Sequence, residues 1–264
     1  MRGPARSTAK PIARATVAEL SRQPARRPVV RAVLSGLVLL AALAVLLSLG
    51  TWQMQRLAWK EQLLADIAER RAEASVPLSA IEAVKAGGTD IEYRPVTVTG
   101  TFENGRERHF LATHEGQSGY HVYAPLRLAD GRFVFVNRGF VPYDQKEPAT
   151  RPEGQVAGEQ TIAGLARQRL EGKPSSLVPD NDLIKNVFYW KDLDAMAASV
   201  RIAPEALVPF FVDADATPNP GGFPIGGVTQ FELPNNHLQY ALTWYGLALA
   251  LVAVSGVYAW RSRR

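Results

Sequence analysis

The chain has 264 residues, a formal net charge of +5 and no cysteine. The lack of cysteine excludes disulfides, iron–sulfur clusters and thiolate-bound zinc or copper. The positive charge lies at the ends, because residues 1–31 and 261–264 hold 11 of the 30 basic residues and one of the 25 acidic ones. The rest of the chain carries 19 basic and 24 acidic groups, a net charge of −5. A basic nucleic-acid-binding domain is therefore excluded.

The N-terminal 50 residues divide into a tail and an apolar segment. Residues 1–31 are rich in Arg, Ala, Pro and Ser without apolar periodicity, which predicts a disordered basic cytoplasmic tail. A mitochondrial transit peptide has a similar composition and is the alternative. Residues 32–50 are predicted as the first transmembrane helix, because residues 32–49 form an uncharged run long enough to span a bilayer. A cleaved signal peptide remains open here, since Ser48-Leu49-Gly50 is a weak small-x-small cleavage site.

A second apolar segment lies near the C-terminus. Residues 236–260 are predicted as the second transmembrane helix, with Asn236 as N-cap and Gln239 in a variant of the capping box. Residues 261–264 form a basic cytoplasmic tail. Basic residues outside both helices place both termini in the cytoplasm, so residues 51–235 lie on the opposite side of the membrane.

Both segments carry small residues at helical spacing, which favour close packing of helices in lipid. We therefore expect the two helices to pack on each other. The small residues that predict this contact are Ala41, Ala44 and Ser48 in the first segment and Gly246, Ala250, Ala253 and Gly256 in the second.

The central domain, residues 51–235, begins with an amphipathic helix, since Trp59, Leu63 and Ile67 form one apolar stripe. This helix should end before Val76-Pro77. The hydrophobic period then changes to two, and short turns such as Glu103-Asn104-Gly105 join consecutive segments. The fold class predicted is a membrane protein of α+β type, with two transmembrane helices flanking one extramembrane, mainly antiparallel and barrel-like β domain. The predicted strands cover residues 93–102, 109–112, 119–128, 133–142, 161–169, 186–190 and 207–212, with a helix over 192–199.

One histidine lies at the expected membrane border. On a helix, His237, Trp244 and the small residues Ala241 and Ala248 share a stripe, with Tyr240 beside it. An imidazole with aromatic neighbours at this depth could bind the iron of a haem. The alternative is that these side chains form an interfacial aromatic belt.

Other chemistry finds less support in the sequence. There is no G-x-S-x-G elbow, no Walker A motif and no G-x-G-x-x-G after a strand, which argues against a hydrolase or a nucleotide-binding enzyme. His109, His114 and His121 lie on or between predicted strands and could bind copper or zinc in a membrane-anchored metalloenzyme. The alternative is three ordinary surface histidines.

Five stretches together resemble the surfeit-locus (Surf/Shy) family of cytochrome c oxidase assembly factors, in the same order and with the same two-helix topology. The resemblance covers residues 49 to about 260 and implies that the first helix is retained as an anchor. The matching stretches are Leu49-Gly50-Thr51-Trp52-Gln53 with Arg56 and Lys60; Gly119-Tyr120-His121-Val122 with Pro125; residues 136–142; Asn186 with Trp190, Asp192 and Leu193; and residues 235–244.

This resemblance implies a role without catalysis, as a respiratory-chain chaperone that helps to mature the haem-copper oxidase and acts on its subunit I. It also implies that haem a is bound transiently, with His237 as the candidate iron ligand. Tyr240, Trp244 and Trp52 are the expected apolar walls. Arg138 is a candidate partner for the haem propionates, with a structural salt bridge as its alternative.

The expected partners are oxidase subunit I, haem a synthase and membrane lipid, with no nucleic acid. The expected location is the bacterial cell inner membrane, with the central domain in the periplasm, and the alternative is the mitochondrial inner membrane. A second function stays open, in which the protein is a scaffold for oxidase subunits that binds no haem.

Overall fold

The computed structural model describes residues 26–231 and 234–264. The chain forms two units, one of Met1–Ala58 with Asn235–Arg264 and one of Trp59–Pro234. Most of the predicted tail lies outside the described residues. Its last part does not follow the prediction, because α1 (Arg26–Ala72) already includes residues 26–31. Pro28 does not prevent this, since proline is tolerated in the first turn of a helix, where its missing N–H has no partner to lose.

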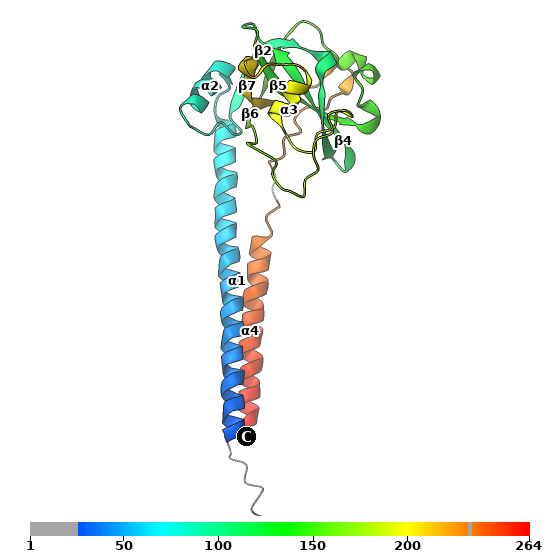
Figure 1. Cartoon of the computed structure of the whole chain (residues 1–264). Coiled ribbons are helices and arrows are strands. Elements are labelled where there is room, and N and C mark those ends of the chain that lie inside the picture. The colour runs from blue at the N-terminus through cyan, green and yellow to red at the C-terminus, as the bar shows by residue number, and fades with distance from the viewer. Residues whose placement is uncertain (1–25, 232–233) are drawn as a thin grey trace, which may run out of the picture. The chain divides into compact units, whose positions relative to one another are not determined.

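The first unit contains two long helices, α1 over its first part and α4 (His237–Ser262), which run side by side in Figure 1. Both are long and apolar enough to cross a membrane. At 47 residues, α1 is about 70 Å long. The predicted transmembrane and amphipathic helices are therefore two parts of one helix.

The two helices pack on each other as predicted, but not through the predicted residues. Ala241 and Ala248 of α4 are buried, and Gly50 of α1 is buried against the ring of Tyr245. All seven small residues named above as contact positions are exposed. Small residues occur on every side of both helices, so their spacing alone could not define the contact face.

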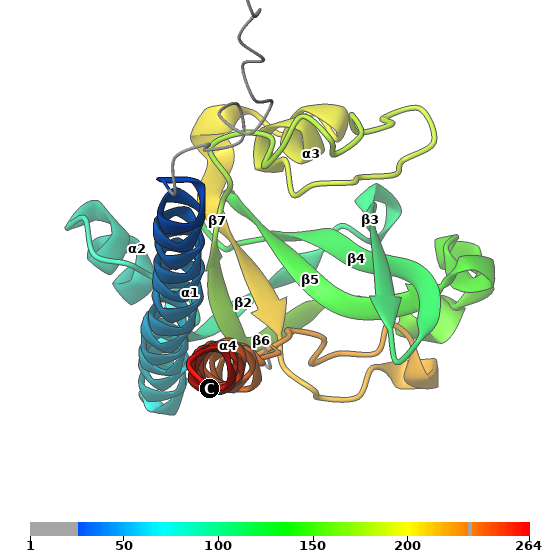
Figure 2. The ribbon, with the colours of Figure 1, turned by 90° about the horizontal axis from the view of Figure 1, so that it is seen from below.

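The second unit is built on a seven-stranded sheet in the order β1-β2-β6-β7-β5-β4-β3, with a further pairing of β2 with β4. That pairing closes five strands into a ring, which confirms the predicted barrel-like form (Figure 2). β1 pairs in parallel with β2, and β5 with β7; the other pairings are antiparallel. The strands are β1 (Val76–Pro77), β2 (Pro95–Phe102), β3 (Arg108–His114), β4 (Gln117–Arg127), β5 (Phe133–Pro142), β6 (Glu159–Gln168) and β7 (Leu207–Ala214).

Successive side chains along the strands point to opposite faces of the sheet, and each face carries its own apolar cluster. Val96 and Val98 of β2 belong to the first cluster, which also takes Ile81 from the short helix α2 (Leu78–Ala86). The second cluster lies on the other side of the sheet, where Phe135 and Phe211 pack against α3 (Leu193–Ser199). Burial of both faces explains why β5 is apolar along nearly its whole length.

The capping and turn residues in the sequence predict the start of α3 but not the capping of α4 or the conformation of residues 186–190. Asp192 caps α3, because its Oδ1 accepts a hydrogen bond from the N–H of Ala195 at 3.0 Å. Asn236 precedes α4 without a side-chain capping bond, so the predicted capping box is wrong. The predicted strand 186–190 contains only isolated bridges, because Asn186 has a φ of +52° and turns the backbone out of the extended conformation.

Candidate functional site

His237 is the first residue of α4, and a hydrogen bond joins it to α1. Its Nδ1 lies 2.7 Å from Oε1 of Gln53, across 184 residues of sequence. An amide oxygen only accepts, so the Nδ1 of His237 carries the hydrogen in this arrangement. In the neutral imidazole the other ring nitrogen, Nε2, then has a lone pair, and this is the tautomer that binds a metal ion through Nε2.

The aromatic residues predicted to surround His237 lie within the same unit. Trp244 is partly buried on the α4 stripe that also carries His237, Ala241 and Ala248. Trp52, next to Gln53 on α1, is 50% exposed, and Tyr240 is 54% exposed. Trp244 therefore lies on the interhelical stripe, whereas Trp52 and Tyr240 present open aromatic surface.

Arg138 belongs to the second unit, on β5, and is only 2% exposed. Its Nη2 donates hydrogen bonds to the backbone oxygen of Gly154 at 2.6 Å and to Oδ1 of Asn219 at 3.1 Å. Its guanidinium also lies 4.6 Å from the ring centre of Phe102. This geometry gives Arg138 the structural role that was the alternative in the sequence analysis, and it offers no support for contact with haem propionates.

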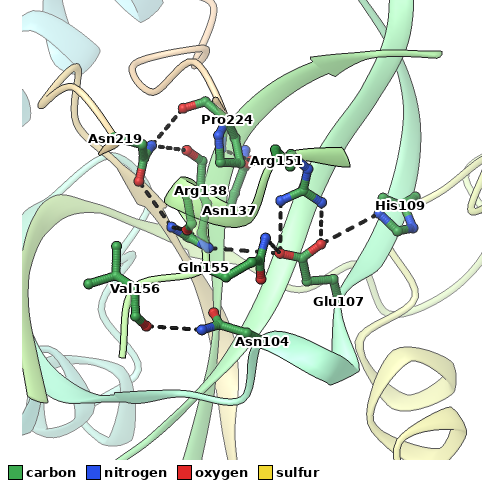
Figure 3. A network of polar contacts seen from close by, with 12 residues as sticks. Asn104, Glu107, His109, Asn137, Arg138, Arg151, Gln155, Val156, Asn219 and Pro224 are labelled. Atoms are coloured by element: carbon green, nitrogen blue, oxygen red, sulfur yellow. Dashed lines mark hydrogen bonds and ion pairs between the residues drawn. The ribbon is translucent and has the colours of Figure 1, made fainter. Parts of the chain in front are cut away.

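Glu107 is the centre of the buried polar network around Arg138 (Figure 3). Both guanidinium Nη atoms of Arg151 donate to its carboxylate, and Nη1 of Arg138 and Nε2 of His109 each lie 3.8 Å from it. Burial alone would raise the pKa of Glu107, but the nearby imidazole of His109 and the hydrogen bonds and charge of Arg151 hold that pKa below its ordinary value. The network ties a loop after β5 to the sheet.

Sequence reasoning did not find Glu107 or Arg151 as partners. The two residues are 44 positions apart and lie in segments without a motif. Their pairing depends on the path of the loop that follows β5, which local patterns do not specify. The advance signal was Arg138, an arginine within a largely apolar strand.

The register of β3 and β4 separates two of the three histidines considered as metal ligands. His109 pairs with Val122 and Phe110 pairs with His121, so His109 and His121 lie on opposite faces of this strand pair. Nδ1 of His109 also lies 2.9 Å from the amide nitrogen of Asn186. Within the described ranges no three His, Cys, Asp or Glu side chains form a group that could hold a metal ion. A metal site of these three histidines, one of the two alternatives left by the sequence, is therefore not formed.

His121 instead lines a small polar cavity of about 180 Å³, together with Asp213 and Lys191. The carboxylate of Asp213 accepts hydrogen bonds from Asn137 at 3.0 Å and from Arg167 and Thr229 at 2.9 Å each. Burial, assisted by the positive charge of Lys191, lowers the pKa of His121 to about 4. His121 is consequently neutral at pH 7.

The two units define a class of membrane protein. In the sequence, one helix of membrane-spanning length precedes a single β domain and a second one follows it. The family model described as the SURF1 family matches residues 40–249. The chain belongs to the SURF1 family.

Relatives in several eukaryotes agree with this assignment. Surfeit locus protein 1 of Xenopus tropicalis is 39% identical over 83% of this chain and 73% of its own length. The human protein of the same name is 38% identical over 81% of this chain and 73% of its own length. A SURF1-like protein of Monosiga brevicollis is 36% identical over 82% of this chain and 84% of its own length. Family membership confirms the resemblance inferred from the five sequence stretches.

The lowered pKa of His121 predicts a pH-dependent stability of the β domain. Between the ordinary histidine pKa of 6.5 and the folded value of about 4, the unfolded chain binds a proton that the folded chain excludes. The free energy of unfolding therefore falls as the pH drops from 6.5 toward 4. The loss between pH 7 and pH 5 should be about 2 kcal/mol, measured by hydrogen–deuterium exchange of β4 amides after correction for intrinsic rates.

His121→Gln should remove this part of the pH dependence, because glutamine does not titrate. His237→Gln replaces a histidine of the first unit, away from the β domain, and as the control should keep it. An unchanged pH dependence in the His121 variant would show that other groups cause the effect.

Proposed function

We propose that this SURF1-family protein assists assembly of a haem-copper cytochrome c oxidase, by holding haem a as cargo for subunit I. Family membership and the resemblance in residues 235–244 support the assembly role. The observation that carries the haem part is the hydrogen bond between His237 and Gln53. When the imidazole is neutral, this bond leaves its Nε2 with a lone pair that iron can accept.

The residues at this end of the helix pair fit a haem. A histidine Nε2 is the usual protein ligand of haem iron, and a hydrogen bond at Nδ1 orients such ligands and raises their basicity. The exposed rings of Trp52 and Tyr240 offer apolar surface to a flat macrocycle. A single imidazole ligand also suits transient binding, because only one bond to iron has to be exchanged during delivery.

The apolar character of haem a explains why its binding site should lie at the membrane. Haem a is largely apolar, and its passage through water would expose that surface. A carrier whose ligand lies at the end of a membrane-spanning helix keeps the macrocycle near hydrocarbon while the iron meets a polar ligand. Haem a synthase and subunit I, both handling this molecule, are the partners that such a carrier requires.

Topology follows from charge. Arg261 lies in the last turn of α4, with Arg263 and Arg264 directly after it, and α1 begins among arginines, so the basic ends of both helices belong in the cytoplasm or the mitochondrial matrix. The central domain then lies in the bacterial periplasm, or in the mitochondrial intermembrane space as the alternative that the eukaryotic relatives favour.

Alkaline phosphatase, which is active only outside the cytoplasm, should be inactive when fused after Arg264 and active when fused within the β domain. Active fusions at the C-terminus would contradict this orientation.

A scaffold without haem is the second candidate function. The net negative charge of the central chain could hold an oxidase subunit by surface contacts, with His237 serving only to join the helices. Both functions are non-catalytic. They differ in one observable, since the scaffold would co-purify with oxidase subunits without Soret absorption.

His237→Ala should abolish haem binding. We expect the full-length protein, purified in detergent from cells that make haem a, to show a Soret band that this variant loses, because alanine has no iron ligand. His114→Ala removes an imidazole from the β domain and should leave the band unchanged. A band of equal intensity in the His237 variant would refute the assignment and favour the scaffold.

Gln53 should act as a positioning residue for His237. Gln53→Leu removes the acceptor for the Nδ1 hydrogen, and loss of such a partner typically costs 10–100-fold in metal affinity. Gln53→Glu keeps an acceptor and should retain haem, with an iron–histidine stretching frequency shifted upward in resonance Raman spectra. Gln55→Leu, at an exposed position two residues further along α1, is the matched control. Equal affinity and an equal stretching frequency in all three variants would exclude this role.

A further inference from the structure

The contact between α1 and α4 differs between the two ends of the first unit. Near the start of α4, a Cβ added to Gly50 would lie 2.7 Å from the ring of Tyr245, so the helices are in close contact. Near the end of α4, a Cβ added to Gly36 would have no heavy atom within 4 Å. The helix pair is therefore tightly packed at one end and open at the other.

The open end forms a groove of about 680 Å³ between the two helices. Small side chains create it, because Ser35 and Gly36 of α1 face Ser255 of α4, where larger residues would fill the space. Its remaining walls are largely aliphatic. When the helices span a membrane, such a groove cannot stay empty, and hydrocarbon is the available filling.

Positive charge surrounds this end of the groove. Arg31 lines it, and Arg261, Arg263 and Arg264 follow at the end of α4. The guanidinium of Arg264 lies 3.9 Å from the ring centre of Trp260, at the end of the same helix. The sequence has no Asp or Glu between positions 20 and 60 or between 237 and 264. The described part of this end therefore presents cations and hydroxyl groups without an acidic side chain.

We propose that this groove binds one anionic phospholipid, with an acyl chain along Leu39 and Val254 and the phosphate at Arg31. The groove supplies the shape for a chain, and the arginines supply the charge for an anionic headgroup, as in other basic pockets between membrane helices. The hydroxyl groups of Ser35 and Tyr258 lie along the path from headgroup to chain. This site needs membrane insertion but is independent of haem binding.

Charge complementarity argues against a neutral apolar helix as the occupant, since such a helix would gain nothing from the arginines that surround the groove.

Native mass spectrometry of the full-length protein tests the proposal, with phosphatidylglycerol and phosphatidylcholine of identical acyl chains as probes. We expect one phosphatidylglycerol to stay bound, at least tenfold more tightly than phosphatidylcholine. Arg31→Gln should weaken phosphatidylglycerol about fivefold, since one basic group near a headgroup contributes about that factor.

A steric variant separates this site from lipid that only surrounds the helices. Gly36→Leu should fill the groove and abolish the bound phosphatidylglycerol. Gly246→Leu is the matched control, because Gly246 also has open space beside it but lies outside the groove. Circular dichroism of both variants should show unchanged helix content.

Three results would overturn the proposal. The first is equal binding of the two lipids, and the second is unchanged phosphatidylglycerol binding in a folded Gly36→Leu variant. The third comes from a photocrosslinking amino acid at Ala32, which also lines the groove. Capture of a protein, including a second copy of this chain, in place of lipid would assign the groove to a helix.

Discussion

The hydrogen bond between His237 and Gln53 fixes how the two apolar helices meet. It joins the first residue of α4 to α1 and selects the tautomer of the imidazole. Close packing of Gly50 against Tyr245 and a contact of 3.2 Å between the hydroxyl groups of Thr51 and Tyr245 hold the same end together. The orientation of His237 is thus set by contacts on both helices, and its chemistry depends on a partner encoded 184 residues earlier.

The β domain is held by a different kind of constraint. Closure of five strands leaves no free edge within the ring, and two apolar clusters cover the two sides of its strands. The buried polar side chains of the β domain are arranged around two carboxylates, those of Glu107 and Asp213. Each carboxylate accepts a hydrogen bond from an arginine, because a buried charge without a partner would lower the free energy of unfolding far more than a buried ion pair does. These networks attach loops to the sheet where backbone pairing has ended.

The elements with a regular hydrophobic pattern could be predicted from the sequence. Apolar runs gave both long helices, and alternating or continuous apolar runs bounded by turn residues gave β2, β4, β5, β6 and β7 close to their observed ends. Sequence reasoning could not give the contact face of α1 and α4, because alanine and glycine occur on all sides of both helices. It also missed the two-residue strand β1, which is too short to show a period, and the nine-residue helix α2.

At the candidate site, the sequence pointed to His237 and its aromatic neighbours but not to the role of Gln53. Gln53 was visible only as part of a stretch that resembles a family, and a motif does not say which atoms meet. Arg138 illustrates the opposite error. Its chemistry suited a propionate partner, but the fold had already used its guanidinium within the β domain.

The strand order has a consequence for how the protein is made. β7 lies between β6 and β5, so the ring cannot close before β7 has been synthesised, and 105 positions separate the end of β2 from the start of β7. At translation rates of about 5–20 residues per second, that interval lasts roughly 5–20 s. During this time apolar strands with unpaired edges emerge from the ribosome while α1 is already complete. Early anchoring of α1 in the membrane would keep such a nascent chain apart from its neighbours until the last strand arrives.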